Sequence, residues 1–171
     1  MSFEIPKIIK TNCHYDKRGY LQEIYLKKNL KKNFKFSLIT FSRRNVFRGF
    51  HFQSKNQQVK LIYLVKGSIL DIVIDLRRRS NNFGKAYRFK LREKNILYIP
   101  KGFAHGYLSL SAENVLLYYM TNYRSAKHEV GLLWNDKDLK IKWPIKNPII
   151  SKKDKKNLKF YEYKKLYMKD S

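Results

Sequence analysis

The feature that most constrains the fold is a succession of short apolar runs, separated at close intervals by turn signals. In the run 69–76 every second residue is Leu or Ile, whereas Asp71 and Asp75 fall on the opposite parity. Such alternation is typical of a half-buried antiparallel strand. No long helical period is visible before residue 150. The sequence therefore predicts an all-β fold.

Several other segments have the length and composition of strands, and turn residues stand between them. We expect strands at 4–11, 20–28, 34–41, 46–53, 59–65, 69–76, 86–91, 96–99, 106–110 and 115–121. The run 59–65 is apolar on both parities and is expected to be buried on both faces. The polar segment 13–19 is expected to be a turn between the first two strands. This pattern predicts an antiparallel sandwich or jelly roll that occupies residues 1–171 as a single domain.

The C-terminal part of the chain has a different pattern. Ser151 and Asp154 have the S-x-x-D spacing of a helix start. We expect 155–168 to form a helix or an irregular segment, so that residues 151–171 provide a short C-terminal helical cover over the barrel.

The net charge of +25 and the pI of about 10.1 raise the question of nucleic-acid binding. However, the lysines are spread along the chain and alternate with apolar residues, as on a solvated face, and no nucleic-acid-binding signature is present. We therefore expect no specific nucleic-acid partner, and a positive field that attracts small anions.

The chain has one cysteine, Cys13, and so no internal disulfide. Its N-terminus lacks the apolar core of a signal peptide, and no run approaches the length of a membrane span. These features predict a cytoplasmic protein without a membrane partner.

The stretch 46–60, V-F-R-G-F-H-F-Q-S-K-N-Q-Q-V-K, places cationic and titratable side chains inside aromatic, strand-like runs. Arg48, His51 and Lys60 are costly to bury unless other groups pair with them, which favours a basic pocket that contains an imidazole. Alternatively, Arg48 and Lys60 point to solvent and His51 is a hydrogen-bonded core histidine. Ideal alternation would put Arg48 and His51 on opposite faces, so a shared pocket requires the bulge that Gly49 permits.

A second motif, I-P-K-G-F-A-H-G-Y-L at 99–108, has the P-x-G-x-x-H spacing of the second motif of cupins, the small jelly-roll barrels. Metal-binding cupins have H-x-H in their first motif, whereas this chain has His51-Phe52-Gln53. The other histidines, His14 and His128, have no strong ligand spacing. We therefore expect no metal site.

Six segments occur in one order over residues 3–160: R-G-F-H-F-Q, Q-V-K-L, D-I-V-I-D-L-R with F-G, I-P-K-G-F-A-H-G-Y, L-L-Y-Y-M-T-N-Y, and L-L-W-N-D with I-K-W-P. In this respect the chain resembles the dTDP-4-dehydrorhamnose 3,5-epimerase family, metal-independent cupins that act on nucleotide-linked 4-keto sugars. The resemblance implies a cupin-like jelly roll, a nucleotide-diphospho-sugar substrate, no cofactor, and a homodimer that exchanges N-terminal strands. It also implies epimerisation at C3, C5 or both, in surface polysaccharide synthesis.

The resemblance assigns four catalytic roles. His51 matches the base, and Asp154 of S-K-K-D matches the carboxylate that pairs with it. Tyr118 matches the acid on the opposite side of the sugar, and Lys60 matches the lysine near the 4-keto oxygen. A purely structural role is the alternative for two of these residues, because Asp154 could cap a helix through Ser151 and Tyr118 could be a core tyrosine.

Five further residues are expected to bind substrate. Arg18 and Arg48 match residues that hold the diphosphate, and Glu23 matches a pocket glutamate. His105 matches a second pocket histidine, although it could instead be structural. Arg124 stands where the family has a tyrosine.

The chain departs from the dTDP enzymes at Leu38-Ile39-Thr40, where these commonly have Gln-x-Asn at the nucleotide end. This departure favours a GDP-4-keto-heptose over a dTDP-4-keto-6-deoxyhexose. Two other functions stay open: a sugar-nucleotide 3,4-ketoisomerase, and a non-catalytic cupin that binds a polyanion or a sugar nucleotide.

Overall fold

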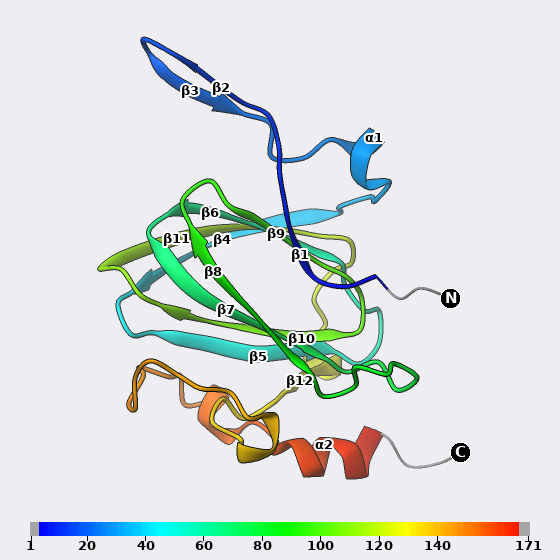
Figure 1. Ribbon diagram of the computed structural model, residues 1–171. Helices are drawn as coiled ribbons and strands as arrows, with labels where there is room; N and C mark the ends of the chain where they lie inside the picture. The colour runs from blue at the N-terminus through cyan, green and yellow to red at the C-terminus, as the bar shows by residue number, and fades with distance from the viewer. Residues whose placement is uncertain (1–3, 168–171) are drawn as a thin grey trace.

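A computed structural model describes residues 4–167 of the chain. Two five-stranded antiparallel sheets face each other and form a jelly-roll barrel (Figure 1). One sheet has the order β1-β9-β6-β11-β4 and the other the order β12-β5-β10-β7-β8. The prediction of an all-β cupin-like jelly roll is confirmed.

The strands are β1 Lys7–Ile9, β2 Cys13–Asp16, β3 Gly19–Gln22, β4 Phe36–Arg43, β5 Phe47–Gln53, β6 Lys60–Lys66, β7 Ser68–Asp75, β8 Ala86–Arg92, β9 Ile96–Ile99, β10 Phe103–Ser109, β11 Glu113–Met120 and β12 Glu129–Gly131. The α-helices are α1 Lys27–Leu30 and α2 Phe160–Tyr167, and the 3-10 helices are η1 Ala126–His128, η2 Lys137–Leu139 and η3 Asp154–Lys156. In the described part of the chain, no helix is both long enough and apolar enough to cross a membrane.

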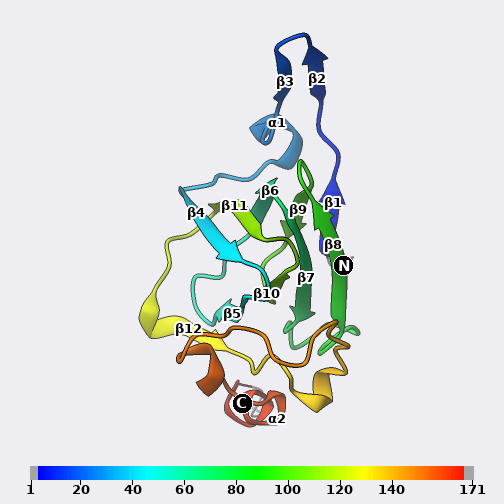
Figure 2. The same ribbon diagram turned by 90° about the vertical axis from the view of Figure 1, so that its left-hand side faces the viewer.

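Apolar side chains fill three layers. The interior layer lies between the sheets and includes Ile62, Val73 and Leu116. The outer face of the β5 sheet packs against the C-terminal segment, whose path under the barrel is visible in Figure 2. The outer face of the β6 sheet packs against residues from the N-terminal part, among them Tyr25 and Phe34. The C-terminal cover that we predicted is therefore present.

Strand β7 differs from the prediction of a half-buried strand, because all of Ile69–Asp75 is buried. Ile72 and Ile74 pack under the C-terminal segment, while Val73 lies in the interior layer. Asp71 and Asp75, expected on an open polar face, are therefore fully buried inside the barrel. Alternation cannot reveal this, because the residues that cover the second face come from a distant part of the chain.

Strand β6 follows its prediction more closely. Leu61 and Tyr63 belong to the layer on the outer face of the β6 sheet, and Ile62 and Leu64 belong to the interior layer. Only the end of the strand departs from burial on both faces, since Val65 is 39% exposed.

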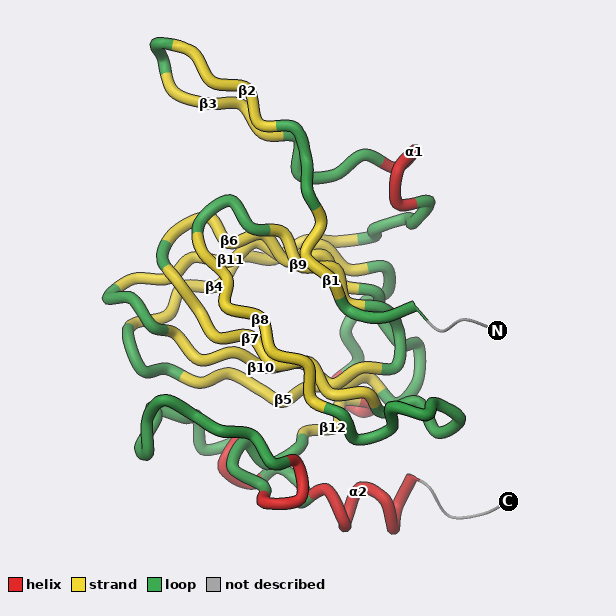
Figure 3. Tube along the Cα trace, viewed as in Figure 1, coloured by secondary structure: helices red, strands yellow, loops and turns green. Residues whose placement is uncertain are grey.

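The N-terminal prediction was wrong in detail. Residues 13–19, expected as a turn, mostly belong to a β2–β3 hairpin that projects from the barrel (Figure 3). The Asp16 carboxylate accepts a hydrogen bond from the Arg18 backbone N–H at 2.8 Å and closes the chain reversal within a few residues. The strand expected at 20–28 ends at Gln22, and α1 follows it.

The C-terminal helix was also only partly predicted. The segment from Asp154 forms η3, Asn157 is extended, and α2 begins at Phe160. Phe160 and Tyr163 bury one side of α2 against the outer face of the β5 sheet. The expected helix extended to residue 168, and the expected cover to residue 171, so the ends of both predictions lie outside the described residues.

A bulge in β5 determines which of its side chains enter the barrel. His51 lies opposite His105 and Arg48 opposite Tyr107, so Gly49 and Phe50 together face one residue of β10. Gly49 has a φ of +131°, and a Cβ there would lie 2.5 Å from the Cα of Gly106. The expected bulge is confirmed, and it lets the Arg48 and His51 side chains line the same cavity.

Candidate active site

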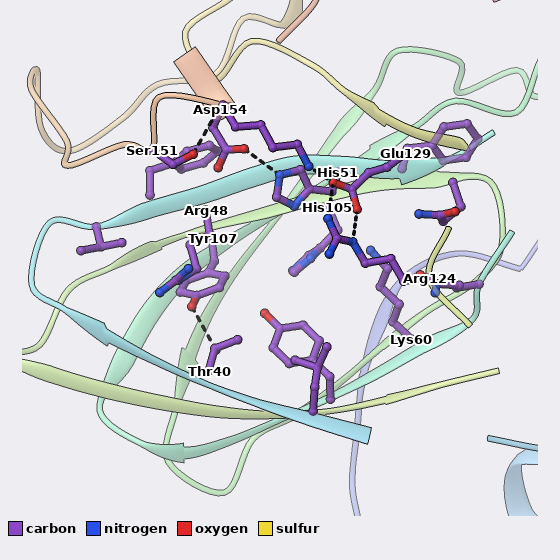
Figure 4. A pocket seen from close by; sticks show the side chains of 18 of the residues that line it. Thr40, Arg48, His51, Lys60, His105, Tyr107, Arg124, Glu129, Ser151 and Asp154 are labelled. Atoms are coloured by element: carbon purple, nitrogen blue, oxygen red, sulfur yellow. Dashed lines mark hydrogen bonds and ion pairs between the residues drawn. The ribbon is translucent and has the colours of Figure 1, made fainter. Parts of the chain in front are cut away.

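Between the two sheets lies a cavity of about 660 Å³, here called the barrel cavity. His51 on β5 and His105 on β10 reach it from one sheet, and Lys60 on β6 reaches it from the facing sheet (Figure 4). Tyr118, on β11 of that facing sheet, also lines the cavity. The cavity is therefore a mixture of titratable side chains and apolar wall, which is the usual make-up of a small-molecule site.

His51 and Asp154 form a hydrogen-bonded pair. The His51 Nε2 lies 2.8 Å from Asp154 Oδ1, and the other carboxylate oxygen accepts the Gly49 backbone N–H at 3.3 Å. Burial opposes ionisation of Asp154, but the hydrogen bond and charge of His51 outweigh it and hold the Asp154 pKa below its usual value. The carboxylate is thus fixed against the imidazole as an anion.

Ser151 contributes to the same corner. Its Oγ accepts the Asp154 backbone N–H at 3.0 Å, while the Asp154 side chain is directed to His51. The local S-x-x-D turn and the pairing with histidine therefore coexist, and the turn sets the position of the carboxylate.

Lys60 and Tyr118 have perturbed proton affinities. Desolvation by burial lowers the Lys60 pKa to about 8, and the negative charges of Asp71 and Glu129 oppose that fall. Burial raises the Tyr118 pKa well above its usual value, with further contributions from Tyr107 and Asp71. At neutral pH the cavity therefore offers an ammonium group and a protonated phenol.

His105 is buried and pairs with Asp71, its Nε2 lying 2.7 Å from Asp71 Oδ2. Burial lowers the His105 pKa although Asp71 opposes this, so the ring is neutral at pH 7. The ring packs edge-on against Tyr118 with 6.1 Å between centroids. Sequence reasoning missed Asp71, although an acidic residue in the middle of an apolar strand was the signal that could have revealed it.

Arg48 also lines the cavity and lies on β5, the strand that contains His51. Its guanidinium donates to Ser42 Oγ at 2.9 Å and to the Phe41 carbonyl at 3.0 Å. Nearby, the Thr40 hydroxyl and the Tyr107 hydroxyl share a hydrogen bond of 3.2 Å. Apolar side chains that line the cavity include Leu38, Val46, Ile149 and Ile150.

At the opposite end of the cavity, Glu129 joins two cations. Its carboxylate accepts from Arg124 Nη2 at 3.1 Å and forms an ion pair with Lys153. Burial would raise the Glu129 pKa, but these hydrogen bonds and the charges of His51 and Lys153 lower it to about 2. Sequence reasoning placed Arg124 in the site but missed Glu129 and Lys153, which have no recognisable motif of their own.

The structure brings seven of the nine predicted site residues to the barrel cavity or its wall: Arg48, His51, Lys60, His105, Tyr118, Arg124 and Asp154. Arg18 and Glu23 do not line it. The Arg18 side chain is 85% exposed on the projecting hairpin and pairs with Asp16, and Glu23 accepts from Asn12 Nδ2 at 3.4 Å. Within a single chain, these two residues lie apart from the predicted site.

Across residues 4–167, no three His, Cys, Asp or Glu side chains are grouped in a way that could hold a metal ion. The prediction of a metal-independent site rests on the sequence and stays a prediction.

A comparison with protein-family models gives one decisive match. The model of dTDP-4-dehydrorhamnose 3,5-epimerase matches residues 3–162. The chain belongs to this family. The resemblance recognised in the sequence is confirmed, as is the prediction of a nucleotide-sugar epimerase at the level of the family.

Members of the family from distant organisms are similar to this chain over most of their length. The dTDP-4-dehydrorhamnose 3,5-epimerase of Shigella flexneri is 35% identical over 170 residues, which are 93% of this chain and 94% of that protein. The enzyme of Methanothermobacter thermautotrophicus is 35% identical over 158 residues, 86% of this chain and 85% of the relative.

Solved structures of the family superpose closely on the barrel. The Bacillus anthracis enzyme, crystallised with TDP and pyrophosphate, is 36% identical with a TM-score of 0.87, and the match covers 90% of this chain and 93% of that one. The Legionella pneumophila enzyme, in complex with dTDP-4-keto-L-rhamnose, is 32% identical with a TM-score of 0.84, covering 89% and 86%. None of these names supports the preference for a GDP-heptose.

Proposed function

We propose that the protein epimerises C3, C5 or both in a nucleotide-diphospho-4-keto-6-deoxy sugar. The observation that carries this proposal is the placement of two proton-transfer groups on facing sheets. The His51–Asp154 pair lies on one side of the barrel cavity and the protonated Tyr118 on the other. A sugar ring held between them would have a base on one face and an acid on the other.

The chemistry begins at a C–H bond next to the ketone. Neutral His51 takes the proton, and the electron pair moves to the carbonyl oxygen to give an enolate. Asp154 stabilises the imidazolium that forms. Lys60 supplies a positive charge for the enolate oxygen, and loss of such a donor typically costs about 10²–10³-fold in rate. Tyr118 then gives its proton to the opposite face of the same carbon and inverts it.

The nucleotide that fits the comparisons best is dTDP. Relatives are named for a dTDP sugar, and two solved neighbours contain TDP or dTDP-4-keto-L-rhamnose. A GDP-linked 4-keto heptose is the second candidate, because the cavity lining contains Leu38 and Thr40 where the resemblance leads us to expect amide side chains. Use of the product in polysaccharide synthesis and a cytoplasmic location stay predictions.

The test is to incubate the protein in deuterated water with dTDP- and GDP-linked 4-keto-6-deoxy sugars and with a GDP-4-keto heptose. Proton NMR should show loss of the C3 or C5 hydrogen with inversion for the preferred sugar. His51→Asn should abolish exchange, and Tyr118→Phe should slow inversion more than exchange. Movement of the ketone to C3 would instead establish a ketoisomerase, and binding without exchange would establish a binding protein.

A homodimer is part of the proposal. The hairpin exposes Tyr15, Tyr20 and Leu21, and β4, at the edge of its sheet, exposes Ile39 and Phe41. An exposed apolar edge strand is a natural site for pairing with another chain. Docking of the hairpin on β4 of a second copy would bury both surfaces.

In that dimer, Arg18 and Glu23 would reach the cavity of the partner subunit. Mixing Arg18→Ala and His51→Asn proteins tests this arrangement at a substrate concentration too low for Arg18→Ala alone to turn over, because a mixed dimer contains one intact site of its two. About a quarter of wild-type activity should return after subunit exchange. No recovery in mixed dimers verified by mass spectrometry would contradict the sharing of sites.

A further inference from the structure

Strand β7 contains two aspartates that point to the same face and are both fully buried, Asp71 and Asp75. Asp75 has a complete set of donors. It accepts the Arg77 backbone N–H at 3.0 Å, the Arg77 guanidinium at 2.6 Å and the Ser80 hydroxyl at 2.7 Å. Such a carboxylate is explained by its structural role at the end of the strand.

Asp71 is different. One of its oxygens accepts from His105 Nε2 at 2.7 Å, but the other, Oδ1, is buried without a hydrogen-bond partner among the described residues. A buried polar atom without a partner is typically destabilising by about 10-fold or more in the folding equilibrium. Stability of the fold therefore does not account for a carboxylate at this position.

The charge of Asp71 acts on three groups of the site. It is the charge that most strongly opposes the loss of a proton from Lys60, and it also favours the protonated form of Tyr118. Its hydrogen bond assigns the His105 ring proton to Nε2, which leaves the lone pair on Nδ1. Asp71 itself does not line the barrel cavity.

We propose that Asp71 is a positioning residue of the reaction, which keeps Lys60 as an ammonium group for the enolate oxygen and holds His105 in one tautomer. The inference deepens the proposed function and rests on it for the role of Lys60. Asp71 acts through these two residues and needs no contact with the sugar.

Other charged and titratable groups face Lys60, and they limit how far its pKa should change when the Asp71 charge is removed. Those that line the same cavity come from several elements: Arg48 and His51 on β5, His105 and Tyr107 on β10, Tyr118 on β11, Glu129 on β12, and Arg124, Lys153 and Asp154. Of these, Glu129 is the anion that also favours protonated Lys60, but it is held by Arg124 and Lys153. Removal of the Asp71 charge should therefore lower the Lys60 pKa from about 8 by about one unit.

Asp71→Asn is the informative variant, since the amide keeps the size and an acceptor for His105. A fall of one unit from a midpoint near 8 would reduce the protonated fraction of Lys60 about fivefold at pH 8 and nearly tenfold at pH 9. We expect the alkaline limb of the kcat/KM profile to move to lower pH by the same amount. Asp75→Asn is the matched control, and it should reduce the melting temperature without moving that limb.

A readout independent of turnover is the pH dependence of Lys60 acetylation by trace acetic anhydride, measured by peptide mass spectrometry. The labelling midpoint should fall in Asp71→Asn and stay in place in Asp75→Asn. An unchanged midpoint in Asp71→Asn would overturn the proposal, and Asp71→Ser serves as the second neutral variant if the amide does not fold. A shifted midpoint in a protein that exchanges no sugar proton would sustain the charge coupling and refute the proposed function alone.

Discussion

Replacing Asp154 with asparagine tests whether the carboxylate acts on His51 or only shapes the turn at η3. The substitution keeps an acceptor for the Gly49 N–H and leaves the Ser151 bond to the Asp154 backbone intact. It removes the negative charge 2.8 Å from His51 Nε2. A neutral amide orients the ring less firmly and does not stabilise the imidazolium.

The size of the effect follows from the burial of this pair, since Asp154 is 5% exposed. A hydrogen bond to a charged group contributes about 1.5–3 kcal/mol. Each 1.4 kcal/mol of transition-state stabilisation is about tenfold in rate, so kcat/KM should fall about 10–150-fold. Because His51 is the partner, adding Asp154→Asn to a His51→Asn protein should cost almost nothing further.

Stability gives the second measurement. The folded-state pKa of Asp154 lies below its usual value of 3.8, so the interactions of its carboxylate with His51 and Gly49 stabilise the fold above that pH, and the contribution is lost as pH falls through the folded value. Urea unfolding should show Asp154→Asn about 1–2 kcal/mol less stable at pH 7, with a smaller gap near pH 3. Wild-type kcat/KM in a destabilised Asp154→Asn protein would mean that the carboxylate is structural, and the dyad reasoning would be wrong.

Three further predictions concern stability. Lys60→Met should be about 1–3 kcal/mol more stable than wild type at pH 7, yet slow in exchange. Burial of the charged Lys60 destabilises the fold fully below pH 8, and this cost disappears as pH rises toward 10.5. Urea unfolding at pH 7 and near pH 10.5 checks this. Glu129→Gln should lose about 1–3 kcal/mol at pH 7 and match wild type near pH 2, since an acid whose folded pKa is about 2 stabilises the fold only above that range. Gly49→Ala should lower the melting temperature far more than Gly19→Ala. Both glycines have a strongly positive φ, but only a Cβ at position 49 would collide with backbone atoms, including the Cα of Gly106. Equal losses would contradict the role of close packing.

The sequence was informative where a local rule decides the outcome. The alternation of β7 and the apolar run of β6 predicted strands, and the glycine at position 49 predicted the bulge that unites Arg48 and His51. The resemblance named seven residues that line the barrel cavity.

What the sequence did not reveal depends on contacts between distant segments. Asp71 alternates as a solvent-facing residue would, and only the facing sheet shows that this side is the barrel interior. Its partner His105 is 34 residues away on another strand. Glu129 joins Arg124 to Lys153, which lies 24 residues further on. Neither pairing can be recognised from the periodicity or the composition of the sequence.

The pairing of the carboxylates also indicates where the substrate charge goes. Asp154 is engaged by His51, Asp71 by His105, and Glu129 by two cations. In the described residues, the Arg48 guanidinium donates hydrogen bonds only to the neutral oxygens of Ser42 and Phe41, and Arg48 lines the cavity.

An exposed guanidinium held in place by neutral acceptors is ready to pair with a diphosphate, so Arg48→Gln should raise KM about 10–100-fold. The deuterium exchange rate at saturating substrate should change little, because the proposed proton transfer uses His51 and Tyr118 and not Arg48. Arg92→Gln removes the same charge from an exposed position outside the cavity and should leave KM within about twofold. If both variants raised KM equally, the general positive field of the chain, and not Arg48, would be what holds the diphosphate.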